Sequence, residues 1–509
     1  MKTLEQSLYQ LIISRLEGER LSSASYRDRA LQLARKGIGG FIVFGGENIN
    51  ETRDFIAELQ GASDTLLFIA SDIERGVGQQ IKGATDFPSL MAIAAMIGKD
   101  KTDDLRLFAN SVKAIAEESA YMGINMPLIP VLDVNTNPEN PIICTRAFSD
   151  DSKEVARLGS IYIKTIEESG LISSAKHFPG HGDTSIDSHI SLPVISKSLK
   201  DLTDTDIWPF AEAIKQGVSS IMLGHISVPA LDSLPATISK KITTGLLRRE
   251  LGYEGLILTD ALIMHALKDV TDICTKSLNA GADILLLPAD ADSAVAELKD
   301  SVKSGAVSEE TIHTAKERIL KYKSEIKNLQ STEPDYEKNK KLSAQITDKS
   351  ITLVKETAGV LPITKDQNLT IIIAGEESDP AASPHSPLKE LLPDSSRVHY
   401  LSKGNPLEAF SVKGSEEIVI IAIFTNVAAW HGSSGIGEEE KIILRKLVKE
   451  SGRAIVLSFG SPYVLRDFQE ADVLIAAYDK SVQAERSTVK CLTGEIDFKG
   501  LLPVNLSLR

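Results

Sequence analysis

The chain of 509 residues is too long for one hydrophobic core of ordinary size, so its length predicts two domains. Hydrophobic residues make up 42% of the chain and charged residues 25%, which is the balance of a soluble globular protein. The formal net charge of −14 disfavours nucleic acids and anionic membranes as partners, because both would repel an acidic surface.

The three cysteines, Cys144, Cys274 and Cys491, are far apart and lack the spacing of a disulfide framework or a zinc site. A reducing compartment fits this use of cysteine. The first residues lack the apolar core and cleavage site of a signal peptide, and no run of about 20 apolar residues follows them. We therefore expect a cytoplasmic protein without a membrane partner, provided that no leader precedes this sequence.

Short apolar runs alternate with longer helix-like segments through about residue 330, a rhythm typical of βα units and a parallel sheet. The eight units predict that residues 1–330 form a (β/α)8 TIM-like barrel. The runs that predict its strands are residues 11–13, 40–44, 66–70, 126–131, 172–175, 219–223, 255–258 and 284–287.

Polar residues at or just beyond the C-terminal ends of these strands support the barrel prediction, because barrel enzymes build their active sites on the face where those ends lie. A doubly wound sheet would also place ligands at strand ends, so this pattern favours the barrel without excluding the other fold. The residues are Asp72, Asp133, His177, His225 and Asp260.

A polar segment interrupted by Pro334 follows, and we interpret residues 331–345 as a linker between domains. A second α/β pattern occupies residues 346–509 and predicts a three-layer αβα sandwich. Its expected strands are residues 369–374, 398–401, 418–424, 454–458 and 473–477.

The stretch 175–189 concentrates three histidines, two aspartates and a lysine directly after a predicted strand. Within it, Asp187 and His189 are two residues apart, so in an extended loop both side chains project to the same side. A carboxylate beside an imidazole favours its protonated form, which predicts an acid/base pair. The alternative is an Asx-type turn made by Asp187 with His189 exposed.

Asp260 follows the apolar run 255–258 and Thr259. An ionised carboxylate at this position is a candidate nucleophile. Aspartate is also favoured at the N-cap of a helix, and the local sequence leaves these two interpretations even.

Several motifs together resemble glycoside hydrolase family 3, specifically its β-N-acetylglucosaminidase branch. The most specific are KHFPGHG at 176–182 with DSH at 187–189, and PATIS at 235–239 with TDAL at 259–262. Shorter matches include FP at 87–88, DVN at 133–135, NP at 140–141, RAF at 146–148 and GHI at 224–226. The family's second domain is similar at SITLVK, 350–355, and GLLPV, 500–504.

The resemblance implies retaining hydrolysis, in which Asp260 attacks the anomeric carbon, His189 serves as acid and then base, and Asp187 orients His189. It also implies that four residues hold the sugar hydroxyls and three shape the pocket. The first group is Asp72, Arg146, Lys176 and His177, and the second is Asp133, His181 and His225.

The leading hypothesis is therefore an exo-acting retaining β-N-acetylglucosaminidase that acts on small saccharides such as cell-wall muropeptide fragments. A phosphorylase is an alternative, because a neutral imidazole would not repel phosphate. A catalytically silent sugar-binding protein is another. His177, His181 and His189 could form a metal triad, but the pairing of His189 with Asp187 explains them better, so no metal or cofactor is expected.

The loop at 430–438 is rich in glycine and serine but lacks the spacing of a phosphate-binding loop. We interpret it as a surface loop, with a contribution to the sugar pocket as the alternative. The sequence leaves the oligomeric state open.

Overall fold

The computed structural model describes residues 3–97, 102–326, 332–357, 359–364, 366–375, 386–391, 397–401, 417–428 and 432–508. The chain forms two compact units, and neither is continuous in sequence. The first unit consists of Met1–Phe87, Ala109–Val134 and Asp151–Lys340, and the second consists of Pro88–Phe108, Asn135–Asp150 and Lys341–Arg509.

Two segments that the sequence assigned to the first domain thus belong to the second unit. The physical reason is their apolar side chains: Met91, Ala92, Ala95 and Cys144 are fully buried in a core cluster whose other members come from residues 372–506. The boundary expected near residue 330 misses these segments because sequence order does not show which core a buried side chain joins.

The strands of the first unit are parallel and pair in the order β4-β3-β2-β1-β8 and β5-β6-β7. Single parallel bridges join Val131 to Lys176 and Leu258 to Ile284, so the strands form a curled sheet. The strands are β1 (Ile12–Glu17), β2 (Gly40–Phe44), β3 (Phe68–Ser71), β4 (Met126–Pro127), β5 (Ser174–Phe178), β6 (Ser220–Leu223), β7 (Leu256–Thr259) and β8 (Leu285–Leu286).

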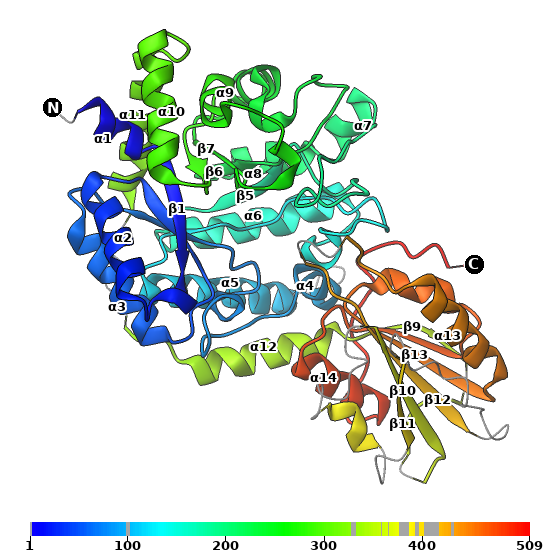
Figure 1. Ribbon diagram of the computed structural model, residues 1–509. Coiled ribbons are helices and arrows are strands. Elements are labelled where there is room, and N and C mark those ends of the chain that lie inside the picture. The colour runs from blue at the N-terminus through cyan, green and yellow to red at the C-terminus, as the bar shows by residue number, and fades with distance from the viewer. Residues whose placement is uncertain are drawn as a thin grey trace. The chain divides into compact units, whose positions relative to one another are not determined.

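Helices cover the outside of these strands (Figure 1). Because both faces of the sheet are covered, strands such as β7 are apolar along their length and do not alternate between apolar and polar residues. The helices are α1 (Leu4–Tyr9), α2 (Ala24–Lys36), α3 (Ile49–Ala62), α6 (Ser152–Glu168), α7 (Leu199–Asp204), α8 (Trp208–Lys215), a π-helix (Lys241–Glu250), α9 (Ile273–Ala280), α10 (Ala291–Ser304) and α11 (Glu309–Glu325).

Two helices cross the boundaries of the units in sequence, α5 (Thr102–Met122) and α12 (Tyr336–Ser350). Helix α12 occupies most of the range expected to be an irregular linker. Asp335 explains why it starts there, because its Oδ1 accepts a hydrogen bond of 3.0 Å from Lys338 N, as an N-cap does.

The second unit is built on a sheet with the order β11-β10-β12-β13-β14-β9. Its strands are parallel except β9, which pairs antiparallel with β14 and was not among the expected strands. The strands are β9 (Thr352–Glu356), β10 (Leu369–Gly375), β11 (Val398–Leu401), β12 (Ile418–Phe424), β13 (Arg453–Phe459) and β14 (Val473–Ala476).

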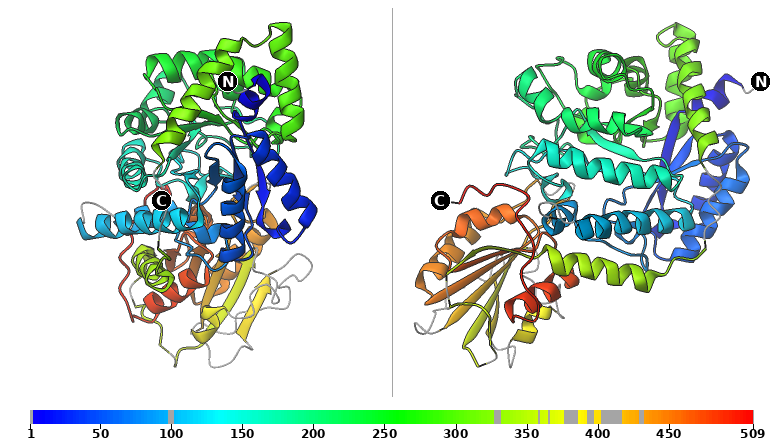
Figure 2. Two further views of the ribbon diagram at one scale, coloured as in Figure 1. Left: turned by 90° about the vertical axis from the view of Figure 1, so that its left-hand side faces the viewer. Right: turned by 180° about the vertical axis from the view of Figure 1, so that it is seen from behind.

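Alternate residues of these strands enter two different cores. In β10, Ile371 and Ile373 pack in one core with residues of α14 (Val482–Leu492), whereas Ile372 packs in the other with residues of α13 (Glu438–Glu450). Figure 2 shows these two helices on opposite faces of the sheet. Successive side chains of a strand point to opposite faces of the sheet, so a sheet that is covered on both faces needs apolar residues at both sets of positions. The described residues of this unit also form helix α4 (Leu90–Ile97).

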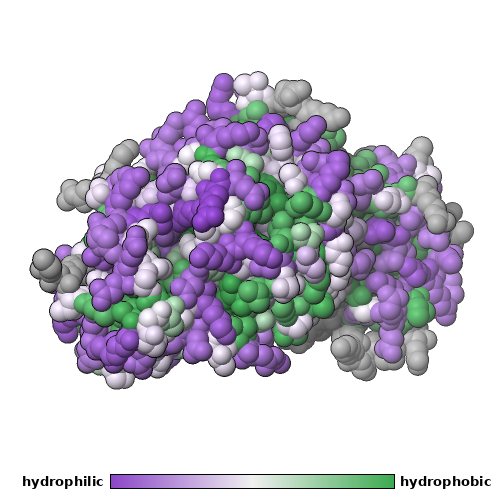
Figure 3. Space-filling model, turned by 90° about the horizontal axis from the view of Figure 1, so that it is seen from above, coloured by the Kyte–Doolittle hydropathy of each residue, from purple (hydrophilic) through white to green (hydrophobic). Residues whose placement is uncertain are grey.

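The prediction of an α/β fold with a parallel sheet, followed by a second α/β unit, is confirmed. Of the loop at 430–438, Trp430 and His431 lie outside the described residues, while Gly437 N donates to Glu440 Oε2 at the start of α13. The face drawn in Figure 3 is largely polar, with apolar residues in separate clusters. Among the described residues, no helix combines the length and apolarity needed to cross a bilayer.

Candidate active site

The predicted site residues of the first unit lie at one edge of its curled sheet. Asp72 directly follows β3, Lys176 and His177 lie in β5, and Asp260 directly follows β7. The carboxyl ends of neighbouring parallel strands meet at the same edge, so the fold brings these side chains toward one another.

Lys176 is almost completely buried and donates to two carboxylates. Its Nζ lies 2.7 Å from Asp72 Oδ1 and 2.8 Å from Glu74 Oε1. Asp72 remains one-third exposed, whereas only 6% of the Glu74 side chain is accessible. Sequence reasoning missed Glu74, although a buried ammonium with three donors needs more than one acceptor.

Asp133 is a fully buried anchor for the segment that contains two predicted site histidines. Its Oδ2 lies 2.7 Å from His177 Nδ1, and its Oδ1 accepts hydrogen bonds from His177 N and, at 2.6 Å, from His181 N. Burial would raise the pKa of Asp133, but the imidazoles of His177 and His181 outweigh it, so the pKa lies below the usual value. Asp133 is therefore an ionised support beneath the loop that follows β5.

His181 is buried and forms hydrogen bonds through both ring nitrogens. Nδ1 lies 2.8 Å from Thr184 Oγ1, and Nε2 lies 3.0 Å from Ser188 Oγ. Both partners are buried, and neither was predicted from the sequence. His181 thus cross-links two points of the loop in which the acid/base pair was expected.

Asp187 and His189 form the predicted pair, with 2.8 Å between Asp187 Oδ1 and His189 Nδ1. His189 N also donates to the same oxygen at 2.9 Å, so the Asx-type turn is present as well and the two interpretations coexist. The Asp187 carboxylate is buried, whereas a quarter of the His189 side chain is exposed. Because a carboxylate accepts, His189 Nδ1 carries a proton and Nε2 is left for other chemistry.

Asp260 follows β7 and accepts a hydrogen bond of 2.7 Å from Ala261 N. The N-cap alternative is wrong, because no helix starts within the three residues after Asp260. Burial would raise its pKa, but His225, His177, the Ala261 amide and His189 together lower it. Asp260 is therefore held as a carboxylate, and those imidazoles are near enough to act on it electrostatically.

His225 connects the end of β6 to the residue after Asp260. Its Nε2 lies 3.0 Å from the carbonyl oxygen of Ala261, which only accepts, so Nε2 carries the proton. Nδ1 lies 2.7 Å from Thr237 Oγ1, a partner that sequence reasoning missed. Burial lowers the pKa of His225 although Asp260 opposes this, so the imidazole is neutral near pH 7.

Arg146 is the one predicted site residue that belongs to the second unit. Its Nη1 donates to the carbonyl oxygen of Ile142 at 2.8 Å. The same segment is fixed inside that unit by Asn135, whose Oδ1 accepts from Cys144 N and whose Nδ2 donates to Tyr463 Oη. The first unit therefore brings together nine of the ten predicted residues, and Arg146 belongs to the second unit.

The three histidines considered as a metal triad point their nitrogens at other partners, namely Asp133, Ser188 with Thr184, and Asp187. Within the described part of the chain, no group of three His, Cys, Asp or Glu side chains is arranged to hold a metal ion.

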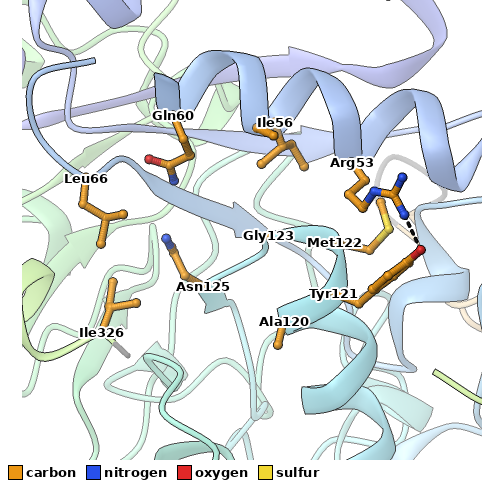
Figure 4. A pocket seen from close by; sticks show the side chains of 11 residues that line it. Arg53, Ile56, Gln60, Leu66, Ala120, Tyr121, Met122, Gly123, Asn125 and Ile326 are labelled. Atoms are coloured by element: carbon orange, nitrogen blue, oxygen red, sulfur yellow. Dashed lines mark hydrogen bonds between the residues drawn. The ribbon is translucent and has the colours of Figure 1, made fainter. Parts of the chain in front are cut away.

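A cavity lies elsewhere in the first unit, between α3 and the end of α5 (Figure 4). Its lining residues Leu66 and Asn125 come just before β3 and β4, so it lies at the amino ends of the strands, away from the polar cluster. The amides of Gln60 and Asn125 already hold backbone groups of Leu67 and Ile69. We therefore attribute no site chemistry to it.

Comparison with known proteins identifies a family. A family model described as "Glycosyl hydrolase family 3 N terminal domain" matches residues 3–322. Beta-hexosaminidase A of Pseudoalteromonas piscicida is 35% identical over 383 residues, which cover 67% of this chain and 63% of that protein. Beta-N-acetylglucosaminidase/beta-glucosidase of Cellulomonas fimi is 27% identical over 505 residues, 88% of this chain and 85% of the relative.

A solved structure extends the likeness over the full length. The glycoside hydrolase family 3 beta-N-acetylglucosaminidase from Paenibacillus sp. str. FPU-7 has a TM-score of 0.83 at 26% identity, with all of both chains covered. The resemblance predicted from the motifs, and with it the class of glycoside hydrolases, is confirmed.

Proposed function

Because this chain belongs to glycosyl hydrolase family 3, we propose that it is an exo-acting, retaining β-N-acetylglucosaminidase. It removes terminal N-acetylglucosamine from β-linked saccharides, of which cell-wall muropeptide fragments are the expected natural source. The names of the relatives, beta-hexosaminidase and beta-N-acetylglucosaminidase, support the choice of sugar.

In the first half-reaction the Asp260 carboxylate attacks the anomeric carbon and forms a glycosyl ester. The bond from that carbon to the leaving oxygen breaks, the electron pair stays on the oxygen, and His189 supplies its proton from Nε2. Asp187 holds Nδ1 and stabilises the imidazolium that donates this proton. The lowered pKa of Asp260 keeps the nucleophile ionised.

In the second half-reaction water attacks the same carbon and the ester bond to Asp260 breaks. The neutral His189 takes the proton from the water, which returns both groups to their starting states. Two displacements give a product of the same anomeric configuration as the substrate.

The remaining predicted residues bind and orient the sugar in this proposal. Asp72 presents its exposed part to the hydroxyls, while the buried carboxylates of Glu74 and Asp133 fix the positions of Lys176 and His177. Asp133, His181 and His225 shape and support the pocket, and a sugar-binding role of Arg146 stays a prediction from the family resemblance.

The observation that carries the proposal is the link between the acid/base pair and the nucleophile segment. Ser188, which separates Asp187 from His189, accepts a hydrogen bond of 3.2 Å through its carbonyl oxygen from Ala266 N, six residues after Asp260. His189 also acts on the carboxyl of Asp260 electrostatically. An acid and a nucleophile close to each other are what glycoside cleavage requires.

A substrate panel tests this function. The enzyme is expected to release nitrophenol from the aryl β-N-acetylglucosaminide and to release it much more slowly from the α-anomer and from aryl β-glucoside. No turnover of the β-N-acetylglucosaminide would contradict the proposal, and a faster β-glucoside would correct the sugar.

Phosphorolysis is the second candidate because His189 is neutral once its proton has left, so phosphate would meet one charged carboxylate fewer than in a site with two. Incubation with and without phosphate separates the two reactions, since a phosphorylase yields the sugar 1-phosphate as its main product. A silent sugar-binding protein would bind the saccharide in calorimetry without turning it over.

We also propose that the first unit is a (β/α)8 barrel, that the second is an αβα sandwich and that the protein is cytoplasmic. The bridges Val131 to Lys176 and Leu258 to Ile284 support closure of the first sheet into a (β/α)8 barrel, and the two cores of the second unit support an αβα sandwich. The three cysteines are unpaired, which supports a reducing, cytoplasmic location.

A further inference from the structure

Ser188 has contacts in two directions that the predicted chemistry does not use. Its side chain is buried, and its Oγ lies 3.0 Å from His181 Nε2. Its carbonyl oxygen accepts from Ala266 N at 3.2 Å. Ser188 therefore ties the middle of the acid/base loop both to the imidazole of His181 and to the segment that follows Asp260.

His181 is itself firmly placed, which makes it a useful anchor. Its backbone N donates to the fully buried carboxylate of Asp133 at 2.6 Å, and its Nδ1 is bound to Thr184 Oγ1. The hydrogen bond from this fixed imidazole therefore restricts where Ser188 can lie. Asp187 and His189 are the chain neighbours of Ser188, so a shift of Ser188 moves both members of the acid/base pair.

We infer that Ser188 is a positioning residue that sets where His189 stands relative to the sugar attacked by Asp260. The inference rests on the proposed function, because it concerns the same two catalytic groups. Proton transfer requires heavy atoms within about 2.6–3.2 Å, and a displacement of about 1 Å lowers a rate by about 100-fold. The Ser188 hydroxyl holds the loop within that tolerance.

Leaving-group dependence distinguishes this role from a general structural one. An aryl group whose phenol is strongly acidic departs without a proton, whereas a phenol of high pKa needs the proton of His189 in the transition state. A misplaced acid therefore slows cleavage of poor leaving groups and spares good ones. A loosened fold or a damaged sugar pocket would slow both alike.

The test measures kcat/KM, which reports the first half-reaction, for dinitrophenyl and unsubstituted phenyl β-N-acetylglucosaminides. Ser188→Ala is expected to lose about 10- to 100-fold on the phenyl substrate and less than about 3-fold on the dinitrophenyl substrate. Ser185→Ala is the matched control, because Ser185 lies in the same loop with an exposed side chain, and it is expected to match wild type.

Ser188→Thr keeps a hydroxyl and is expected to recover most of the loss on the phenyl substrate. Equal losses on both substrates, or no loss, would overturn the inference while leaving the proposed function intact. A wild-type enzyme that cleaves neither substrate would instead refute the proposed function. Thermal melting of each variant separates misfolding from misplacement, because a misfolded variant loses both activities together with its transition.

Discussion

Asp260 directly follows a buried strand, whereas His189 lies in a segment without regular structure, residues 179–193. The position of Asp260 is set by β7 and by the Ala261 amide, which any sequence folding into this strand would supply. The position of His189 is set by side-chain hydrogen bonds among Asp187, Ser188 and His181. The position of the nucleophile therefore depends on the fold, and the position of the acid/base depends on a few polar contacts. Substitution of the nucleophile should slow cleavage of every substrate, whereas substitution in the acid/base loop should slow mainly the substrates with poor leaving groups.

The largest expected effect is on the nucleophile side. Asp260→Asn retains the oxygen that accepts from Ala261 N but cannot form the glycosyl ester, so kcat/KM should fall on the order of 10⁴-fold or more for every leaving group. Because β7 places this residue, the melting temperature should stay close to wild type. A variant with substantial turnover would contradict the role of Asp260.

Removal of the acid should cost less and should depend on the substrate. His189→Ala is expected to lose about 10²- to 10⁴-fold in kcat/KM on phenyl β-N-acetylglucosaminide and far less on the dinitrophenyl compound. Asp187→Asn should show the same leaving-group pattern with a smaller loss, since asparagine keeps an oxygen for His189 Nδ1 and His189 N and removes only the negative charge. Losses of kcat/KM that are the same for both leaving groups would show that His189 is not the acid.

Substitution of Glu74 should have a smaller effect, on the binding of the sugar. In Glu74→Gln, Lys176 keeps one charged partner, Asp72, and is expected to draw this carboxylate away from the sugar. KM should rise about 10-fold, equivalent to about 1.4 kcal/mol, with kcat changed much less.

Glu47→Gln is the control for Glu74, because Glu47 pairs with Lys82 in an exposed ion pair of the same unit and should have no kinetic effect. A fall in kcat with KM unchanged in Glu74→Gln would argue against a binding role.

The smallest expected effect concerns stability and pH. The folded-state pKa of His225 is below its usual value of about 6.5, so below that pH the unfolded chain binds a proton that the folded protein does not. This residue's contribution to stability is thus present above about pH 6.5 and is lost as the pH falls through the folded pKa, at up to about 1.4 kcal/mol per pH unit.

His225→Gln keeps a donor for the Ala261 carbonyl and should flatten the fall in unfolding free energy below about pH 6.5. His313→Gln, at an exposed histidine, is the control and should leave the slope as in wild type. An unchanged slope in His225→Gln would show that another group causes the acid sensitivity.

The same contrast explains how much the sequence could predict. The strand before Asp260 was expected at 255–258 and is found at Leu256–Thr259, because a continuous apolar run marks a strand with both faces covered. The strand expected at 172–175 extends as β5 through Phe178, and Lys176 and His177 lie within it. Their polarity hid this extension, because their counter-ions come from distant residues.

Other features depend on contacts that no local pattern encodes. Strand β9 pairs antiparallel with β14 more than 100 residues away, and the local pattern 352–356 does not show that partner. The sequence did not reveal the roles of Glu74, Thr184, Ser188 and Thr237, because each acts through a residue distant in the sequence or across a turn. By contrast, the Asp335 cap that starts α12 was readable in the sequence but was interpreted as part of a linker.

Above all, we propose that Asp260, at the end of β7, and His189, in the loop 179–193, act on the same sugar. Mass spectrometry of His189→Ala after treatment with an activated fluorinated N-acetylglucosaminyl donor tests it most directly. The donor needs no acid to react, and its fluorine slows the water step. We predict a stable glycosyl ester on the peptide that contains Asp260. A label on another residue, or no label although the variant consumes the donor, would contradict the account.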